Sequence, residues 1–304
     1  MPSRVTVIMN ASAGAADKEA LAVTLKDAFG SAGVDARIVL VRHGEKIGDV
    51  ARRALDERPD VIVAGGGDGT MNAVAATLVG TDIAMGVLPL GTLNHFAKDL
   101  RIPLDLDEAV RNIVAGHVVN VDVGEVNGRI FVNNSSLGIY PRIVRDREQQ
   151  QRMGRGKWVA FAWSVLAVLR RHSFLSVRVA AGSQEHMART PFVFIGNNEY
   201  QMEGFAMGTR DRLDEGRLSV YMVHHAHRWG LLRLALRALF GRLRQAKDFE
   251  AFCVPQFLVE TRHKRMNVAM DGEVTWMDMP LRYQVRPGAL RVIVPAPVAP
   301  AGGE

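Results

Sequence analysis

Cysteine is nearly absent from this chain of 304 residues, which has only Cys253. A single cysteine cannot form an intrachain disulfide, so the sequence gives no reason to place the protein in an oxidising compartment. Long apolar runs are missing too: the longest, Trp158 to Leu169, has 12 residues, whereas a membrane-spanning helix needs about 20. The first ten residues lack the character of a secretion signal. We therefore expect a cytoplasmic protein that does not cross a membrane.

The remaining composition is that of a folded protein, with 48% apolar and 23% charged residues, and the length favours two domains. The net charge of +6 is distributed unevenly. Residues 142–171 contain eight Lys and Arg against two acids, and residues 228–247 contain six against none. Such local basicity favours an anionic partner, either phospholipid headgroups or nucleic acid. Because no nucleic-acid-binding module is recognisable, we expect a membrane surface and no nucleic acid.

Residues 1–125 alternate β-branched runs with helical patterns, which is typical of βα units around a parallel sheet. The predicted strands are Val5–Met9, Ala36–Val41, Val61–Ala64 and Ile83–Leu88. The predicted helices are Asp17–Phe29, Lys46–Glu57, Thr70–Leu78, Leu93–Leu100 and Asp107–Ala115. In such sheets ligands bind beyond the carboxyl ends of the strands, so the loops at residues 10–14, 65–70 and 89–92 are the candidate site.

Residues 126–304 show short strands with turn signals, which is typical of an antiparallel β-sandwich domain. Asn127-Gly128 between two β-rich runs predicts a hairpin. The predicted strands are Val119–Val126, Arg129–Leu137, Leu175–Ala181, Pro191–Asn197, Leu218–His224, Phe257–Thr261, Met266–Met270 and Leu281–Val285. Two basic helices, Lys157–Arg171 and Trp229–Phe240, interrupt them, and the Pro-, Ala- and Gly-rich tail Pro295–Glu304 is expected to be disordered.

The loop Gly65-Gly66-Gly67-Asp68-Gly69-Thr70 lies between a predicted buried strand and a predicted helix. Glycines let the backbone approach a polyphosphate, and the helix N-terminus adds positive potential. Thr70 can cap the helix or reach a phosphate oxygen. An ordinary tight turn is the alternative, which this density of glycine disfavours. The loop lacks a Walker lysine and a dinucleotide fingerprint, so we expect a phosphate-binding loop of another lineage.

Three motifs, in this order, closely resemble the diacylglycerol kinase catalytic-domain family, which includes bacterial lipid kinases and sphingosine kinases. They are Gly66-Gly67-Asp68-Gly69-Thr70, Pro89-Leu90-Gly91-Thr92-Leu93-Asn94-His95-Phe96-Ala97 and Asp271-Gly272-Glu273. NAD kinases and phosphofructokinases share the first motif but not, as a set, the other two. The resemblance covers nearly the whole chain. It implies an α/β nucleotide domain and a β-sandwich domain with a cleft between them, ATP as phosphate donor and a lipid hydroxyl as acceptor.

The resemblance also implies roles for individual residues. Those expected to bind the nucleotide are Asn10, Gly66, Gly67, Asp68, Gly69, Thr70, Asn72, Gly91 and Thr92. Asp271 is the expected general base, because a carboxylate in the turn after a strand can accept the proton of an attacking hydroxyl. Glu273 would assist it, and Asp68 would orient Mg²⁺ or the nucleophile. For Asp271-Gly272 a plain hairpin turn is the alternative.

Family members carry a structural Mg²⁺ in a loop that matches residues 212–217. The implied ligands are the carbonyl groups of Arg212 and Arg217 and the carboxylate of Glu215, where aspartate is usual. Two further departures are Ala11 in place of proline and His95 in place of aspartate, and neither removes a group that phosphate transfer requires. His224-His225-Ala226-His227 has no companion ligands, so an exposed strand end is expected there rather than a metal site.

Both predicted basic helices carry an apolar stripe flanked by arginines, which suits a helix at a membrane interface; core packing is an alternative of similar weight. We expect peripheral binding to anionic phospholipid at the inner membrane face. The leading hypothesis is a lipid kinase that uses ATP and Mg²⁺. A nucleotide or sugar kinase of the NAD kinase and phosphofructokinase superfamily and a non-catalytic regulatory nucleotide-binding module remain open. The acceptor lipid and the oligomeric state, including a homodimer, also remain open.

Overall fold

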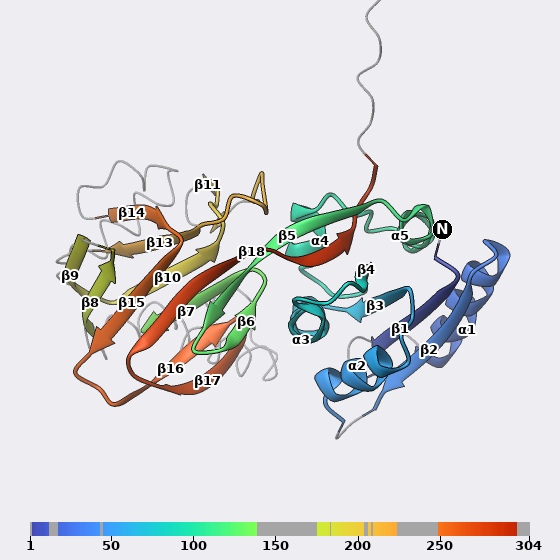
Figure 1. Cartoon of the computed structure of the whole chain (residues 1–304), viewed down its shortest axis with the longest axis horizontal. Coiled ribbons are helices and arrows are strands. Elements are labelled where there is room, and N and C mark those ends of the chain that lie inside the picture. Colours follow the sequence, from blue (N-terminus) through green and yellow to red (C-terminus); the bar gives the residue numbers. More distant parts are fainter. Residues whose placement is uncertain are drawn as a thin grey trace, which may run out of the picture. The chain divides into compact units, whose positions relative to one another are not determined.

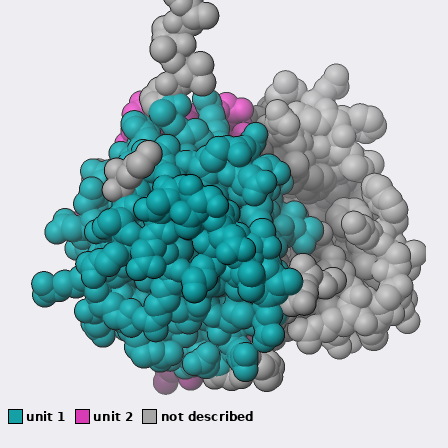
Figure 2. Space-filling model, turned by 90° about the vertical axis from the view of Figure 1, so that its right-hand side faces the viewer, with its two compact units in different colours: residues 1–121, 288–304 teal, residues 122–287 magenta. Residues whose placement is uncertain are grey.

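The computed structural model describes residues 2–11, 18–42, 45–138, 175–182, 184–203, 206–207, 209–223 and 249–296. The chain forms two compact units, which Figure 2 colours separately: Met1–Val121 with Gly288–Glu304 (unit 1) and Asp122–Pro287 (unit 2). The two predicted basic helices, the histidine run and residues 297–304 of the predicted tail lie outside the described residues. Within the described part of the chain, every helix is too short or too polar to pass through a bilayer.

Unit 1 is built on a parallel sheet whose strands lie in the order β2-β1-β3-β4. These strands are β1 (Arg4–Asn10), β2 (Asp35–Val41), β3 (Val61–Gly66) and β4 (Ala84–Pro89). The register pairs Met9 with Gly65 and Gly66 with Pro89, so β1, β3 and β4 end level with one another. The ends of these three strands are therefore neighbours, at the edge where a parallel sheet binds its ligands.

Among the described residues, five helices accompany this sheet, and each was predicted. They are α1 (Lys18–Ser31), α2 (Ile47–Asp56), α3 (Asp68–Leu78), α4 (His95–Asp99) and α5 (Leu106–Ala115). Alternate residues of β1 pack in one core with α1 and α5, while α2 contacts α3 and the other residues of the sheet (Figure 1). Every residue of β3 and β4 is buried, because helices cover both faces of the sheet.

The chain passes between the units twice, within β5 (Val118–Val126) and within β18 (Leu281–Ile293). The first passage lies at residues 121–122, close to the predicted boundary at 125. At the second, Gly288–Glu304 return to unit 1, whereas the sequence predicted that all of residues 126–304 form the second domain. In unit 1 the end of β18 lies beside β4, with Val292 next to Met85. The reason is that buried apolar residues resume after Pro287-Gly288, as Leu290, Val292 and Ile293.

Unit 2 is a sandwich of two antiparallel sheets around one apolar core. One sheet contains the end of β5, β6 (Arg129–Phe131), the start of β18, β15 (Gln256–Thr261), β8 (Leu175–Ala181) and β9 (Gln184–Thr190). The other contains β14 (Phe249–Val254), β13 (Leu218–Val223), β10 (Phe192–Asn197), β7 (Asn134–Gly138), β16 (Arg265–Met270) and β17 (Glu273–Asp278). A short ribbon joins β11 (Met202–Glu203) to β12 (Ala206–Met207). The predicted α/β plus β-sandwich fold class is confirmed.

The predicted hairpin at Asn127-Gly128 is present, with positive φ angles of 46° and 80° between β5 and β6. The predicted strand Arg129–Leu137 is instead divided into β6 and β7. The division occurs because Val132 and Asn133 lead the chain from one sheet of the sandwich to the other. Strands β9, β14 and β17 were not predicted, since their polar and charged residues obscure the alternation.

Replacing Ile293 should destabilise unit 1, although this residue lies far along the chain from the rest of that unit. Its side chain is 1% exposed within the core that β1, β3 and α5 share. We expect Ile293→Ala to lower the free energy of unfolding by about 2–4 kcal/mol, measured by urea denaturation. Val23→Ala, at a position that is 61% exposed, is the control and should change it by less than about 0.5 kcal/mol. Equal effects of the two substitutions would contradict the placement of β18.

Candidate functional site

The first glycine loop joins the end of β3 directly to α3. Gly67 is the N-cap of α3, and within the described residues no side chain caps this helix start. The first amides of a helix lack intrahelical acceptors, so they are available to an anion, and the helix dipole favours negative charge there. Thr70, predicted to cap the helix or to reach a phosphate oxygen, is the third residue of α3. Its buried side chain fills the position that a Cβ of Gly66 would occupy, so Thr70 packs the turn.

The second glycine loop packs directly against the first. The Leu90 N–H donates to the Gly66 carbonyl at 3.0 Å. A Cβ on Gly91 would lie 2.5 Å from the Gly67 Cα. Two non-bonded carbon atoms cannot approach so closely, so the backbone would have to move. Gly91 is therefore required because the two loops meet backbone to backbone.

Asn94 fastens the second loop from inside. It adopts a left-handed conformation, with φ of 51°, which asparagine tolerates better than most residues. Its Oδ1 accepts the Gly91 N–H at 3.1 Å, and its Nδ2 donates to the carbonyls of Pro89 and Gly91 at 3.2 and 2.9 Å. We did not predict this role, and its signal in the sequence is the asparagine placed just before a short helix.

Asp68 links the two loops through its side chain. Its Oδ1 accepts the Phe96 N–H, in the first turn of α4, at 3.3 Å. The carboxylate that the sequence assigns to Mg²⁺ or the nucleophile thus also caps a neighbouring helix. This contact fixes α4, which begins at His95 rather than at the predicted Leu93.

Two asparagines complete the group of predicted nucleotide-binding residues. Asn10 ends β1 beside the glycine loop, as the register of β1 and β3 requires. Asn72 lies in α3, and its Oδ1 is buried without a hydrogen-bond partner among the described residues. A buried polar atom without a partner is costly, by roughly 1–3 kcal/mol, so a bound ligand that satisfied Asn72 would be favoured. Together with the exposed Thr92, these residues fit a phosphate-bearing ligand at the strand ends.

Asp271, in unit 2, occupies the tight turn between β16 and β17. Asp271 and Gly272 have positive φ angles of 45° and 88°, so the predicted alternative of a hairpin turn is present. The carboxylate nevertheless points inward and accepts backbone N–H groups from Val132 at 2.8 Å and from Asn133 and Asn134 at 2.9 Å. One side chain thus both belongs to a hairpin and holds the passage from β6 to β7.

Burial raises the pKa of Asp271 from 3.8 to about 6, and the three amides lower it less than burial raises it. A carboxylate offers about four acceptor positions, and the amides occupy three of them. The remaining position, on Oδ2, could accept a proton from a substrate hydroxyl. A base with a pKa near 6 is ionised at neutral pH and well matched to general-base catalysis there. Glu273, the predicted assistant, begins β17 with its side chain exposed.

Arg210 was missed by sequence reasoning, because an isolated arginine in a loop carries no recognisable pattern. It is only 2% exposed. Its Nη1 donates to the Val132 carbonyl at 2.7 Å and its Nη2 to Asn133 Oδ1 at 2.7 Å. Arg210 and Asp271 therefore hold the same short segment.

The loop predicted to hold Mg²⁺ is neutralised by its own arginines. Both oxygens of Glu215 accept hydrogen bonds from the Arg217 guanidinium, at 3.0 and 3.1 Å, and the Arg217 carbonyl accepts the Asn198 N–H at 3.0 Å. The Arg212 guanidinium pairs with Asp214 in the same way. The described residues contain no cluster of three or more metal-binding side chains. A cation would have to displace Arg217, so the donors as arranged do not fit Mg²⁺.

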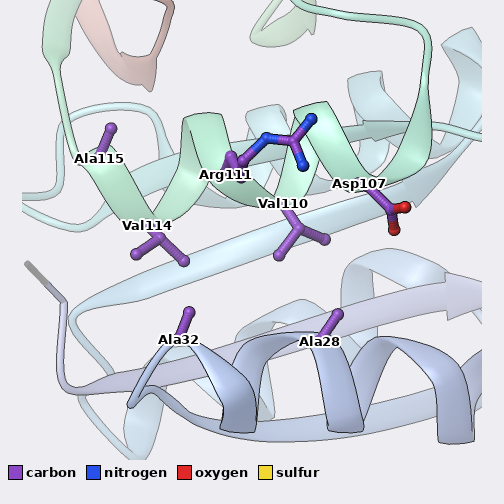
Figure 3. Close-up of a pocket in the computed structure, with 7 residues that line it drawn as sticks. All are labelled: Ala28, Ala32, Asp107, Val110, Arg111, Val114 and Ala115. Carbon is purple, nitrogen blue, oxygen red and sulfur yellow. The ribbon is translucent and has the colours of Figure 1, made fainter.

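A surface hollow in unit 1 lies between α5 and the C-terminal part of α1 (Figure 3). Ala28 of α1 and Ala32, which directly follows this helix, leave space opposite α5. The charged residues beside it, Asp107 and Arg111, are exposed and opposite in sign. None of the predicted site residues lines this hollow, so we assign it no role in the chemistry.

Comparison with known proteins agrees with the two-domain fold. Residues 4–126 match the diacylglycerol kinase catalytic domain, and residues 136–294 match the YegS C-terminal NAD kinase beta sandwich-like domain. The chain belongs to the diacylglycerol kinase catalytic-domain family. The resemblance inferred from the three motifs is confirmed.

Individual members of this family are distant. A diacylglycerol kinase of Staphylococcus saprophyticus is 28% identical over 189 residues, which are 60% of this chain and 61% of that protein. One from Staphylococcus aureus is 30% identical over 189 residues, 60% of this chain and 59% of the relative. The chain thus spans about three fifths of the length of these curated relatives. A solved diacylglycerol kinase structure from Bacillus anthracis str. Sterne shares the fold, with a TM-score of 0.74 and 20% identity over 97% of this chain and 98% of that one.

The contact between the glycine loops predicts different outcomes for two similar substitutions. Gly91→Ala should lower the free energy of unfolding by about 1–3 kcal/mol, because its Cβ meets rigid backbone. Gly67→Ala should cost less than about 1 kcal/mol, because its Cβ would lie 3.5 Å from the Gly91 Cα, an ordinary contact. Urea denaturation of both variants measures this, and a tolerated Gly91→Ala would contradict the close approach.

Asp271 should make stability depend on pH. Between pH 3.8 and about 6 the native state holds more protons than the unfolded chain, so the free energy of unfolding should fall as pH rises. The fall attributable to this group is at most about 3 kcal/mol, as a shift of roughly two pH units implies. Urea denaturation of wild type and Asp271→Asn between pH 4 and 7 isolates it. Parallel curves for the two proteins would show that the carboxyl titrates normally.

Because arginines pair with the carboxylates of the loop at residues 212–217, we expect divalent cations not to change the stability of the protein when no nucleotide is present. Adding Mg²⁺ or a chelator should shift the melting temperature of the wild type by less than about 1 °C, since no preformed site gains binding energy. Arg217→Ala should lower stability by about 1 kcal/mol or less, because Arg217 is partly exposed. A saturable, Mg²⁺-dependent rise in the melting temperature of the wild type would restore Glu215 as a metal ligand.

Proposed function

We propose that this protein is an ATP-dependent lipid kinase, which transfers the γ-phosphate to a hydroxyl of diacylglycerol or a related lipid. The observation that carries the proposal is the packing of two glycine loops at the uncapped start of α3. The unpartnered Oδ1 of Asn72 beside this helix start supports it. So do the names of the Staphylococcus relatives, which are diacylglycerol kinases.

In this proposal unit 1 binds the nucleotide. The first-turn amides of α3 would donate to phosphate oxygens, and Asn10, Asn72 and Thr92 would fix the rest of the nucleotide. Asp68 keeps α4 and the second loop in position through the Phe96 N–H. Mg²⁺ bound with the nucleotide would neutralise charge on the phosphates.

Unit 2 would supply the proton acceptor. Asp271 is ionised at neutral pH, and its remaining acceptor position would take the proton of the lipid hydroxyl. The three amides fix the carboxylate, so it would need no reorientation before it accepts the proton.

A lipid acceptor would bring the protein to a membrane surface. The concentrated basic charge of residues 142–171 and 228–247 supports binding to anionic phospholipid, because each basic residue near such a surface adds favourable energy. We accordingly propose a cytoplasmic protein that binds the inner membrane face peripherally.

Incubation with γ-labelled ATP, Mg²⁺ and vesicles made from a total lipid extract tests the proposal. We expect one labelled lipid, and Asp271→Asn should lower its formation about 100-fold or more, because the base is lost. Glu273→Gln should lower it less than about tenfold. Asp278→Asn, an exposed carboxylate on β17, is the matched control and should behave as wild type. Full activity of a folded Asp271→Asn protein would remove Asp271 from the chemistry.

The same assay separates the alternatives. Phosphorylation of a water-soluble acceptor that proceeds without vesicles or micelles would indicate a nucleotide or sugar kinase instead. ATP binding without transfer to any lipid or soluble acceptor would indicate a regulatory nucleotide-binding module.

A further inference from the structure

Arg210 is the largest fully buried side chain of the described residues, and the proposed chemistry does not use it. Beyond its bonds to Val132 and Asn133, its Nη1 donates to the Asn197 carbonyl at 2.9 Å. Its guanidinium also lies 5.2 Å from the centre of the Tyr200 ring. Burying a full positive charge costs free energy of solvation unless the charge is paired. The complete burial of the Arg210 guanidinium therefore needs an explanation beyond packing.

The segment Val132–Asn134 is held from two directions by opposite charges. Asp271 accepts its N–H groups, whereas Arg210 donates to the Val132 carbonyl and the Asn133 side chain. In this segment the N–H groups point to the carboxylate and the Val132 carbonyl points to the guanidinium. The two charges therefore polarise the peptide groups between them in the same direction. The two charges therefore reinforce one another through this backbone.

Arg210 is the charged residue that acts on Asp271 among the described neighbours. Its positive charge lowers the pKa of Asp271, against the rise that burial causes. Other ionisable side chains in this part of unit 2 include two phenols and the acid Glu273. Tyr200 donates its hydroxyl to the Asn133 carbonyl at 3.1 Å. The Tyr283 hydroxyl forms a hydrogen bond with Ser135, and burial raises the pKa of this phenol above its usual value. Glu273 on β17 is exposed.

We propose that Arg210 is a positioning residue for the reaction: it orders Val132–Asn134, whose amides hold the Asp271 carboxylate, and its charge keeps that carboxylate in the proton-accepting form. The role rests on the proposed function only in that Asp271 is the base. Its electrostatic part applies to the folded protein whether or not a lipid is phosphorylated.

The first test measures the folded protein without substrate. The free energy of unfolding is followed from pH 4 to 8 in wild type, Arg210→Met and Tyr200→Phe, each with and without Asp271→Asn. The difference within each pair gives the midpoint at which Asp271 titrates. Tyr200→Phe is the matched control, because it removes one hydrogen bond to the same segment and leaves both charges.

We expect Arg210→Met to move this midpoint upward by about half a pH unit or more, since the favourable charge is lost. Arg210→Lys keeps the charge and should move it less. Tyr200→Phe should lower stability and leave the midpoint within about 0.2 pH units of the wild type. Should Arg210→Met not fold, Arg210→Gln replaces it, because its amide can still donate to a carbonyl. If the titration midpoint of Asp271 does not move in Arg210→Met, or in the Arg210→Gln variant that replaces it, the proposal is overturned.

The second test uses lipid phosphorylation. In the Arg210→Met variant, the acidic limb of the kcat/KM profile should move to higher pH by the same amount as the titration midpoint of Asp271. The KM for ATP should not change. A moved midpoint with an unmoved acidic limb would show that Arg210 does not act on the reaction. A wild type without kinase activity would instead refute the proposed function and leave the first test intact.

Discussion

The carboxylate of Asp271 holds the chain where it passes from one sheet of unit 2 to the other. Val132, Asn133 and Asn134 leave β6 in the first sheet and enter β7 in the second, so their amides cannot all join a ladder. Buried amides without partners are costly, and one acidic side chain satisfies all three. The same contact fixes the turn between β16 and β17, and it lowers the pKa of Asp271 against the larger rise that burial causes.

This arrangement reconciles the two interpretations of Asp271-Gly272. The pair forms a hairpin turn, as most such pairs do, with both residues at positive φ. The turn also buries a charged group whose retention at this point costs stability at neutral pH. Such a cost is common at functional sites, where residues are held in states that the fold alone would not favour. Arg210 limits this cost from the other side of the segment.

The fold was largely predictable because it depends on periodic patterns. Uninterrupted apolar strands separated by amphipathic helices specify a covered parallel sheet, and Asn-Gly specifies its hairpin locally. The glycine loops and their neighbourhood were predictable for a similar reason: a parallel sheet places the ends of β1, β3 and β4 at one edge. The division of Arg129–Leu137 and the return of β18 to unit 1 were not predictable, because both depend on contacts distant in the sequence.

The residues that support the site were missed for the same reason. Asn94, Arg210 and the amides of Val132–Asn134 act through hydrogen bonds to residues that no local pattern links to them. Glu215 stands where the motif predicts a metal ligand, and its carboxylate accepts hydrogen bonds from Arg217 two residues on. The motif predicts a metal ligand from residue identity, whereas the pairing with Arg217 depends on side-chain geometry that the motif does not contain.

The most direct test of the account is a pH titration followed by nuclear magnetic resonance. The protein is labelled with ¹⁵N and with ¹³C at the aspartate carboxyl groups, and Asp271→Asn identifies the Asp271 signal. The account predicts that this signal and the amide shifts of Val132, Asn133 and Asn134 change together, with one midpoint near pH 6. A carboxyl signal that titrates below pH 4, or amides that do not follow it, would contradict the account.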